Sequence, residues 1–227
     1  MPLKLYYWDL RGRAENIRVL LKYLKVNYRE INPSYGEWPN LKKKFIHEGF
    51  SFPNLPMIDD RGFMLSESKA ILTYLAQTRG DGSLAGKTPQ DQAIIKQIEG
   101  VIDEVYNHLL QVAFTLSYKS KLQQAASDKL LRVVKRLQNH FADGRDYAVG
   151  YFTVADIMIS GFYRFINNFY RSAKLKNPME KKILYYHTLR VSNLPGIKEY
   201  YASSEYKNRV SFPISWLKEY PLAVPSS

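Results

Sequence analysis

The sequence predicts an α/β half followed by an all-helical half. Strand-like and helical patterns alternate over the first eighty residues, whereas the periodic segments beyond residue 88 have the three- to four-residue spacing of helices. Between the two halves, residues 79–87 carry three glycines and no periodicity, which is typical of a linker. With 227 residues, the chain is long enough for two compact domains. We therefore expect a domain at 1–80, a linker at 81–87 and a second domain at 88–227.

The first half opens with a short strand and a helix. Residues 3–7 are mostly apolar, and Gly12 interrupts them. From Ala14 to Leu24, apolar residues recur at helical spacing, and 26–31 alternates weakly as a second strand. The charged segment 32–49 is predicted to be irregular.

The first half ends with a hairpin and a second helix. A strand is expected at 52–58, entered through two prolines, with a turn at 59–62 and a return strand at 63–65. Ser66 is predicted to cap a helix over 67–77. The order β-α-β, loop, β-β-α is that of a thioredoxin-like domain, whose sheet is mixed because the hairpin strands are antiparallel.

The second half contains three long helical patterns. An apolar stripe from Ile94 to Val112 predicts a helix that extends to Lys119, and a second helix is expected at 122–141. Residues 153–156 (TVAD) form a capping box, with aspartate in place of glutamate, at the start of a third. The remaining pieces are shorter and are expected at 181–189 and 196–201, before a proline-punctuated aromatic tail at 212–225.

The composition limits the classes of protein to which this chain can belong. No apolar run approaches the ~18–20 residues that cross a membrane, and Lys4 and Asp9 interrupt any signal-peptide core. The chain has no cysteine, which excludes disulfides and thiolate metal sites, and its four histidines lack metal-ligand spacing. We expect a cytoplasmic protein with no metal.

The net charge of +12 permits a nucleic-acid or acidic-membrane surface. The 33 basic residues are nevertheless spread along the chain, and the densest short run is Lys42–Lys44. We interpret the charge as solvated faces with a general preference for anions. Neither a membrane nor a nucleic acid is therefore the expected partner, although nucleic-acid association stays open as an alternative.

Six short motifs, all in one order, resemble those of the cytosolic glutathione transferases. Residues 7–15 (YWDLRGRAE) combine the spelling of the mu and sigma classes, both of the tyrosine type. The others are WPNLK at 38–42, NLP at 54–56, ESKAI at 67–71, LAGKT at 84–88 and TVAD at 153–156. The helical half beyond Tyr106 matches less well.

The resemblance implies a thioredoxin-like glutathione-binding domain and an all-helical domain that forms the hydrophobic substrate pocket and part of a dimer interface. It implies an enzyme that conjugates the glutathione thiolate to apolar electrophiles, with glutathione as co-substrate. A homodimer with a detoxification role is the family expectation. Two alternatives remain: a non-catalytic protein of the same fold that binds glutathione or apolar ligands, and a glutathione-dependent isomerase of the prostaglandin type.

Tyr7 is the expected catalytic residue, as donor of a hydrogen bond to the glutathione sulfur. A thiol with a pKa near ~8.5 is only partly ionised at neutral pH, and its thiolate is the nucleophile. Tyr6 lies on the opposite face of the strand, because side chains alternate. The resemblance implies that Trp8 and Arg13 lie beside the glutathione thiol, where Arg13 adds positive potential.

The resemblance also assigns the rest of the tripeptide. Leu55, before a cis Pro56 and after Asn54, pairs its backbone with the cysteinyl amide. Glu67 and Ser68 begin a helix whose N-terminus faces the γ-glutamyl carboxylate. The glycyl carboxylate is assigned to Trp38 and Lys42, with Lys43 and Lys44 as competing lysines.

Two further assignments concern the neighbouring subunit and the electrophile. Asp103 resembles a residue that reaches across the dimer to the partner's glutathione, and Asn107 is its rival one helical turn on. The hydrophobic substrate pocket is expected between Leu10 and the first long helix, where it meets Tyr106 and Leu110.

Overall fold

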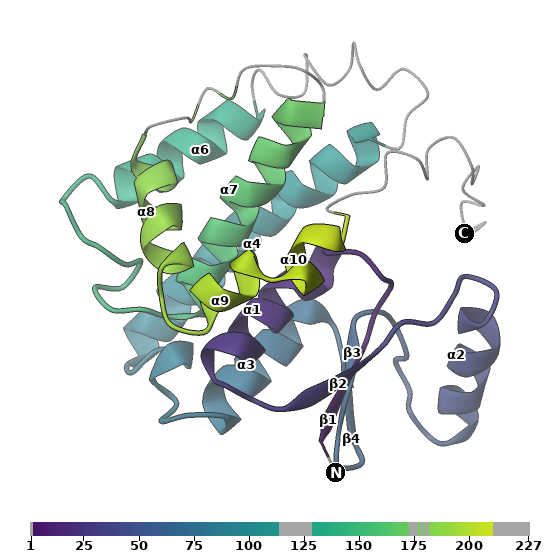
Figure 1. Ribbon diagram of the computed structural model, residues 1–227. Coiled ribbons are helices and arrows are strands. Elements are labelled where there is room, and N and C mark those ends of the chain that lie inside the picture. The colour runs from purple at the N-terminus through teal and green to yellow at the C-terminus, as the bar shows by residue number, and fades with distance from the viewer. Residues whose placement is uncertain (1, 114–128, 173–176, 178, 180–181, 211–227) are drawn as a thin grey trace.

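The computed structural model describes residues 2–113, 129–172, 177, 179 and 182–210. A four-stranded sheet in the order β2-β1-β3-β4 forms the centre of the first half (Figure 1). Its strands are β1 (Leu3–Tyr6), β2 (Tyr28–Ile31), β3 (Met57–Asp60) and β4 (Phe63–Ser66). β1 is parallel to β2 and antiparallel to β3, and β3 is antiparallel to β4. The predicted mixed sheet is confirmed.

Helices cover both faces of this sheet. A 3-10 turn, η1 (Gly12–Ala14), leads into α1 (Glu15–Tyr23), which lies with α3 (Ser68–Thr78) on the face toward the helical half (Figure 1). The opposite face carries α2 (Trp38–His47). The result is a thioredoxin-like layer arrangement.

The helix α2 corrects the prediction of an irregular segment at 32–49. Pro39 stands in its first turn, where a missing N–H costs nothing because that group has no intrahelical partner. Leu41 and Phe45 then recur at helical spacing, and Phe45 packs with Tyr6 and Met57 under the sheet. Three consecutive lysines and a short apolar pattern hid this periodicity in the sequence.

Two boundaries of the hairpin region also differ from the prediction. The strand expected at 52–58 begins only at Met57, since prolines 53 and 56 have no N–H to donate to a sheet ladder. The Leu55–Pro56 bond is cis, as predicted. Ser66 does not cap α3: it lies in β4, and its hydroxyl donates to the carbonyl oxygen of Phe52 at 2.5 Å. The N-cap position belongs to Glu67.

The second half is helical, as predicted. Its long central helix, α7 (Val154–Ser172), packs against α4 (Pro89–Ala113), α8 (Ile183–Ser192) and α1. The other elements are η2 (Ser83–Ala85), α6 (Lys129–His140), α9 (Ile197–Ala202) and α10 (Ser204–Asn208). The predicted extension to Lys119, the start of the second helix at 122 and the tail at 212–225 lie outside the described residues. One continuous apolar core joins α1 and α3 to these helices.

Asp156 fixes the start of α7. Its fully buried carboxylate accepts hydrogen bonds from the backbone N–H of Thr153 and of Ala148, each at 2.8 Å. It also accepts from the Thr153 hydroxyl at 3.1 Å and contacts Nε2 of His187 at 2.9 Å. One half of the predicted TVAD capping box, the bond from the Thr153 N–H to the Asp156 carboxylate, is therefore present, while the Asp156 N–H donates to the carbonyl oxygen of Thr153 at 3.1 Å. In the described part of the chain, no helix has both the length and the apolar character of a membrane span.

Candidate active site

Tyr7 directly follows β1, and its backbone is held by the neighbouring strand. Its N–H donates to the carbonyl oxygen of Ile31 at 3.1 Å, and its own carbonyl accepts from Nδ2 of Asn32 at 2.9 Å. The ring is 6% exposed and packs with Leu10 and Ala14. Both the main chain and the ring of Tyr7 are thus fixed before any ligand binds.

The two tyrosines of the strand point to opposite faces, as predicted. The ring of Tyr6 packs edge-on against Phe45 of α2, with 5.6 Å between ring centroids. The ring of Tyr7 lies on the other side, toward η1 and α1. Tyr7 is therefore the tyrosine of this pair that faces the helical half.

The Tyr7 hydroxyl accepts one hydrogen bond and keeps its proton available. The backbone N–H of Arg13 donates to its oxygen at 3.0 Å. Among the described residues, none accepts the hydroxyl proton in return. Burial raises the pKa of Tyr7, against the opposing effects of the Arg13 N–H and the Arg18 charge, so the phenol stays protonated at neutral pH. A neutral, oriented O–H donor is what this position offers.

Gly12 allows the close approach of the main chain to that hydroxyl. Its φ is +42°, in the region that side-chain-bearing residues rarely adopt. A Cβ at this position would lie 2.5 Å from the Tyr7 hydroxyl oxygen and 2.5 Å from Cδ1 of Leu10. Neither neighbour has room to move, because both side chains are buried. The residue before the Arg13 amide must therefore be glycine.

If the Tyr7 hydroxyl is the catalytic group that the resemblance implies, we expect Gly12→Ala to lower kcat/KM by about tenfold or more while the chain stays folded, because a displacement near 1 Å is enough for such a loss. Gly36→Ala is the matched control, since a Cβ there meets no atom within 4 Å. Steady-state conjugation rates and circular dichroism measure the two effects. A Gly12→Ala enzyme with wild-type kcat/KM would show that the hydroxyl tolerates displacement.

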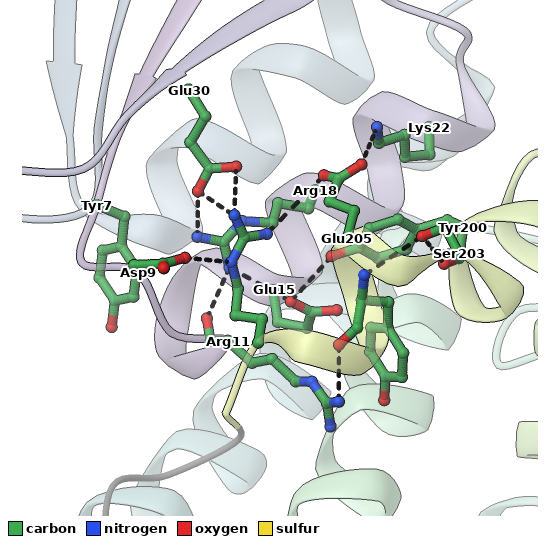
Figure 2. A network of polar contacts seen from close by, with 12 residues as sticks. Tyr7, Asp9, Arg11, Glu15, Arg18, Lys22, Glu30, Tyr200, Ser203 and Glu205 are labelled. Carbon is green, nitrogen blue, oxygen red and sulfur yellow. Dashed lines mark hydrogen bonds and ion pairs between the residues drawn. The ribbon is translucent and has the colours of Figure 1, made fainter.

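A buried network of charges holds the loop that follows Tyr7 (Figure 2). Nη1 of Arg18 donates to the carbonyl oxygens of Leu10 at 2.9 Å and Arg11 at 3.1 Å. Arg18 also pairs with Glu30, with 2.5 Å between Nη2 and Oε1. Arg209, just after α10, reaches the same Glu30 at 3.2 Å and Asp9 at 3.1 Å. Residues from both ends of the chain thus fix residues 9–11.

An aromatic cluster borders the loop on the side of α2. The Trp8 ring stacks on Tyr35, with centroids 4.4 Å apart, and meets Trp38 edge-on at 6.2 Å. Lys42 follows Trp38 by one helical turn and is exposed. Of the competing lysines, Lys43 is also exposed, whereas Lys44 lies 3.8 Å from Glu48.

The segment before Pro56 meets the start of α3. Nδ2 of Asn54 donates to Oε1 of Glu67 at 3.3 Å, and Oδ1 of Asn54 accepts from the Leu55 N–H at 3.0 Å. The Leu55 side chain packs against the cluster of Tyr7 and Leu10. The structure therefore brings Asn54, Leu55, Glu67 and the first turn of α3 to the same edge as Tyr7.

Asp103 is engaged within its own chain. Nη1 of Arg13 lies 3.0 Å from its Oδ1, and Nζ of Lys69 lies 3.5 Å from its Oδ2. Asn107 bonds to both Arg13 and Asp103. Burial alone would raise the pKa of Asp103, but its bond to Arg13 and the two cations lower it below the usual range. A hollow extends from Gly12 past Ser68 to Asp103.

Tyr106 of α4 stands between this hollow and a second one. The guanidinium of Arg13 lies 5.0 Å from its ring centroid, and the ring centroid of Phe165 lies 4.5 Å from that of Tyr106. Burial raises the pKa of Tyr106, so it too is a neutral donor. Leu110 lies in α4, but its side chain is outside the described residues.

No cluster of three or more acidic, histidine or cysteine side chains suited to a metal occurs in the described part of the chain.

Comparison with known proteins decides the family. Family models of the glutathione S-transferase N-terminal and C-terminal domains match residues 3–77 and 103–204. The class-mu 26 kDa isozyme 7 of Fasciola hepatica is 30% identical over 225 residues, which cover 95% of this chain and 94% of the relative. This chain belongs to the glutathione S-transferase family.

Other similar proteins support the same family assignment for this transferase. Glutathione S-transferase Mu 4 of Mus musculus is 33% identical over 66% of this chain and 69% of the relative. The crystal structure of the glutathione S-transferase Blo t 8 superposes with a TM-score of 0.78 at 29% identity, covering 93% of this chain and 97% of that one. Rat hPGDS complexed with a quinoline superposes with a TM-score of 0.74 over 89% and 96% of the two chains, and at 21% identity it supports the fold alone. The predicted fold, the transferase activity and glutathione as co-substrate are confirmed.

Sequence reasoning missed two residues of this site, Asn32 and Arg18, and one contact of Arg13. Asn32 and Arg18 hold the backbone around Tyr7, and the Arg13 contact to the Tyr7 hydroxyl comes from its backbone amide. Asn32 directly follows β2, the parallel neighbour of β1. Its place at the end of that strand, level with Tyr7 at the end of β1, could have indicated a contact with Tyr7. Nothing in the sequence marked Arg18, because its fully buried side chain sits among the apolar residues of an amphipathic helix.

Proposed function

We propose that Tyr7 is the hydrogen-bond donor to the glutathione sulfur in this transferase. The observation that carries the proposal is the Tyr7 hydroxyl, whose oxygen is fixed by the Arg13 N–H at 3.0 Å while its proton has no acceptor among the described residues. A hydrogen bond to a charged acceptor stabilises it by roughly 1.5–3 kcal/mol. Each pKa unit corresponds to about 1.4 kcal/mol, so this bond lowers the thiol pKa by about one to two units.

Arg13 contributes in two ways under this proposal, one at the Tyr7 hydroxyl and one at the sulfur. Its backbone N–H polarises the phenol oxygen, which makes the O–H a stronger donor. Its guanidinium is paired with Asp103, so the positive potential that it contributes at the sulfur is partly compensated. The thiol proton first passes to solvent. The thiolate then forms a bond to the electrophilic carbon, and the bond from that carbon to its leaving group breaks, with the electron pair going to the leaving group.

The remaining assignments are proposals with separate support. The backbone of Leu55 lies beside the Tyr7 cluster, where an extended cysteinyl segment can add to it. Glu67 and Ser68 present the N-terminal end of α3, which favours a carboxylate. Trp38 and Lys42 lie one helical turn apart on α2 beside Trp8, as a site for the glycyl carboxylate needs. Asp103 is proposed for the partner's glutathione.

We propose that the substrate pocket lies against Tyr106, and that residues 1–80 and 88–227 act as the glutathione-binding and substrate domains around the linker 81–87. A cytoplasmic detoxification role fits this division. The functional test is conjugation of glutathione to 1-chloro-2,4-dinitrobenzene, with turnover above the uncatalysed rate. Retention on a glutathione matrix with conjugation at the uncatalysed rate would instead identify a binding protein of the same fold.

A homodimer is part of the proposal, and Phe52 supports it. This side chain is 78% exposed, the most exposed large apolar residue among those described, and its carbonyl is anchored by Ser66. Burying such a ring in a second subunit is favourable by about 1.5–3 kcal/mol.

We expect Phe52→Asp to shift the protein from dimer to monomer, because the carboxylate cannot be buried in an apolar contact without a partner. Sedimentation equilibrium measures the mass directly. Phe63→Asp, at a less exposed ring of β4, is the control and should leave the mass unchanged. A Phe52→Asp protein that stays dimeric would exclude this residue from the interface.

A further inference from the structure

A second hollow borders Gly12, close to the Tyr7 hydroxyl. It extends from Gly12 between α1, α4 and α7 toward α9 and α10, and Tyr106 forms a wall that it shares with the hollow at Asp103. Because Gly12 borders both hollows and nearly touches the Tyr7 hydroxyl, this one opens beside the position proposed for the sulfur. We therefore expect the electrophile to bind in this second hollow.

The wall of this pocket toward α4 and α7 is apolar. Ile102, Met158 and Phe162 are buried side chains, and the rings of Tyr106 and Phe165 complete that side. Gly161 belongs to the same wall and faces Asn16 of α1, where a Cβ would lie 2.1 Å from the Asn16 amide oxygen. An apolar or aromatic substrate body fits here.

The end of the pocket toward α9 and α10 carries two guanidinium groups, those of Arg164 from α7 and of Arg11 from the loop before η1. The Arg164 guanidinium lies 3.7 Å from the ring centroid of Tyr201, and its Nη2 donates to the Ser192 hydroxyl at 2.7 Å. Arg11 lies over the Tyr206 ring at 3.8 Å and donates to the carbonyl oxygen of Tyr206 at 2.8 Å. Stacking and neutral acceptors thus hold the Arg164 group in place, whereas the charge of Arg11 also acts on Glu15, whose pKa burial raises and Arg11 helps to lower.

The Arg164 charge is not neutralised by an acid. Within the described residues, Arg164 has no ion pair with a carboxylate: its Nη atoms donate to the hydroxyls of Tyr206 and Ser192, and its buried Nε has no hydrogen-bond partner. Glu15 is the single acidic residue of the lining. Its Oε2 already lies 3.3 Å from the Arg18 guanidinium and accepts from Tyr200 at 3.3 Å. The pocket therefore has a net positive potential at one end.

We propose that this pocket selects electrophiles that carry a carboxylate on an apolar body, with Arg164 as the principal anion-binding residue and Arg11 beside it. The inference rests on the proposed function, since it names the substrate class of the same site. A rigid, stacked guanidinium is well suited to a planar carboxylate, because its N–H groups are pre-oriented as a fork. The carboxylate would lie toward α9 and α10, and the reactive carbon toward Tyr7.

The test compares 4-chloro-3,5-dinitrobenzoate with its methyl ester as electrophiles. In both reactions the glutathione sulfur forms a bond to the ring carbon, the C–Cl bond breaks, chloride leaves and the thiol proton goes to solvent. Binding is measured separately, by equilibrium dialysis of 3,5-dinitrobenzoate and its methyl ester, which have no leaving group. We expect the wild-type enzyme to bind the carboxylate more tightly and to have the lower KM for it.

We expect Arg164→Gln to reduce the ratio of ester to carboxylate dissociation constants by about tenfold, the size of one charge-assisted hydrogen bond. Arg164→Lys should recover part of this ratio. Arg171→Gln, at an exposed arginine of the same helix, is the matched control and should leave the ratio unchanged.

Two outcomes would overturn the inference. One is a wild-type preference for the ester; the other is an equal loss of carboxylate and ester binding in Arg164→Gln, which would make Arg164 purely structural. If dialysis shows the carboxylate preference while neither electrophile is conjugated, the anion site stands and the proposed catalytic role of Tyr7 fails.

Discussion

Replacing Tyr7 with phenylalanine is expected to lower kcat/KM at pH 7 by about 10- to 100-fold and to raise the pKa of bound glutathione toward ~8.5. The lost interaction is one hydrogen bond from a neutral hydroxyl to an anion, about 1.5–3 kcal/mol, or one to two pKa units. The fold should be unchanged, because the phenylalanine ring fills the same pocket against Leu10 and Ala14.

The direction of the pH dependence follows from which group ionises. Burial raises the pKa of Tyr7, so this phenol remains protonated across the pH range in which the thiol titrates. The acid limb of the kcat/KM profile therefore reports the thiol. Because the hydroxyl stabilises only the thiolate, its removal shifts that limb to higher pH, and activity should recover as the pH rises above the thiol pKa.

The measurement is the pH profile of conjugation, together with the thiolate absorbance of the enzyme–glutathione complex. Tyr6→Phe is the matched control, since that ring packs against Phe45 on the other face of the sheet. A Tyr7→Phe enzyme with an unshifted acid limb, or an inactive Tyr6→Phe enzyme, would remove Tyr7 from the proposed role.

How far the sequence predicts this structure depends on the range of the interactions. The strand before Tyr7, the helix after Gly12 and the cis bond at Pro56 follow from local patterns or from the resemblance, and the structure contains them. Alternation along a strand was enough to separate Tyr6 from Tyr7. Helix α2 was missed because its apolar face is short and three lysines obscure its period.

The contacts that fix the Tyr7 hydroxyl were not predictable, since they join residues by geometry and not by spacing. The bond from the Arg13 amide exists only because Gly12 adopts a positive φ that turns this N–H toward the ring. Arg209 reaches Glu30 across 179 positions of the chain. A single sequence contains no signal for a contact of that separation.

A second large effect is expected from Arg18→Met, which should destabilise the protein by about 3–5 kcal/mol, the usual cost of removing one partner of a buried ion pair. Arg18 is 0% exposed. Burial alone would lower its pKa, but the hydrogen bond and charge of Glu30 raise it, so the group is charged at every accessible pH. Methionine keeps the volume and removes the five N–H donors.

The loss is large because several acceptors are left without a donor. Glu30 would lose both bonds from Arg18 and keep the contacts to Arg209 and to Nδ2 of Asn32, each at 3.2 Å. The carbonyl oxygens of Leu10 and Arg11 would lose their shared donor. For a chain of this length the melting temperature should fall by about 6–20 °C. Scanning calorimetry measures the shift, and Arg29→Met, at an exposed position of β2, should melt within about 2 °C of the wild type.

A second substitution separates the charge of Arg18 from its packing. Adding Glu30→Gln to Arg18→Met removes the carboxylate that lost its partner, so the double variant should regain part of the lost stability. Conjugation should stay low in both, because Leu10 and Arg11 still lack the donor that holds the loop between Tyr7 and Gly12. A double variant no more stable than Arg18→Met would assign the effect to packing, and full activity in Arg18→Met would show that this loop needs no anchor.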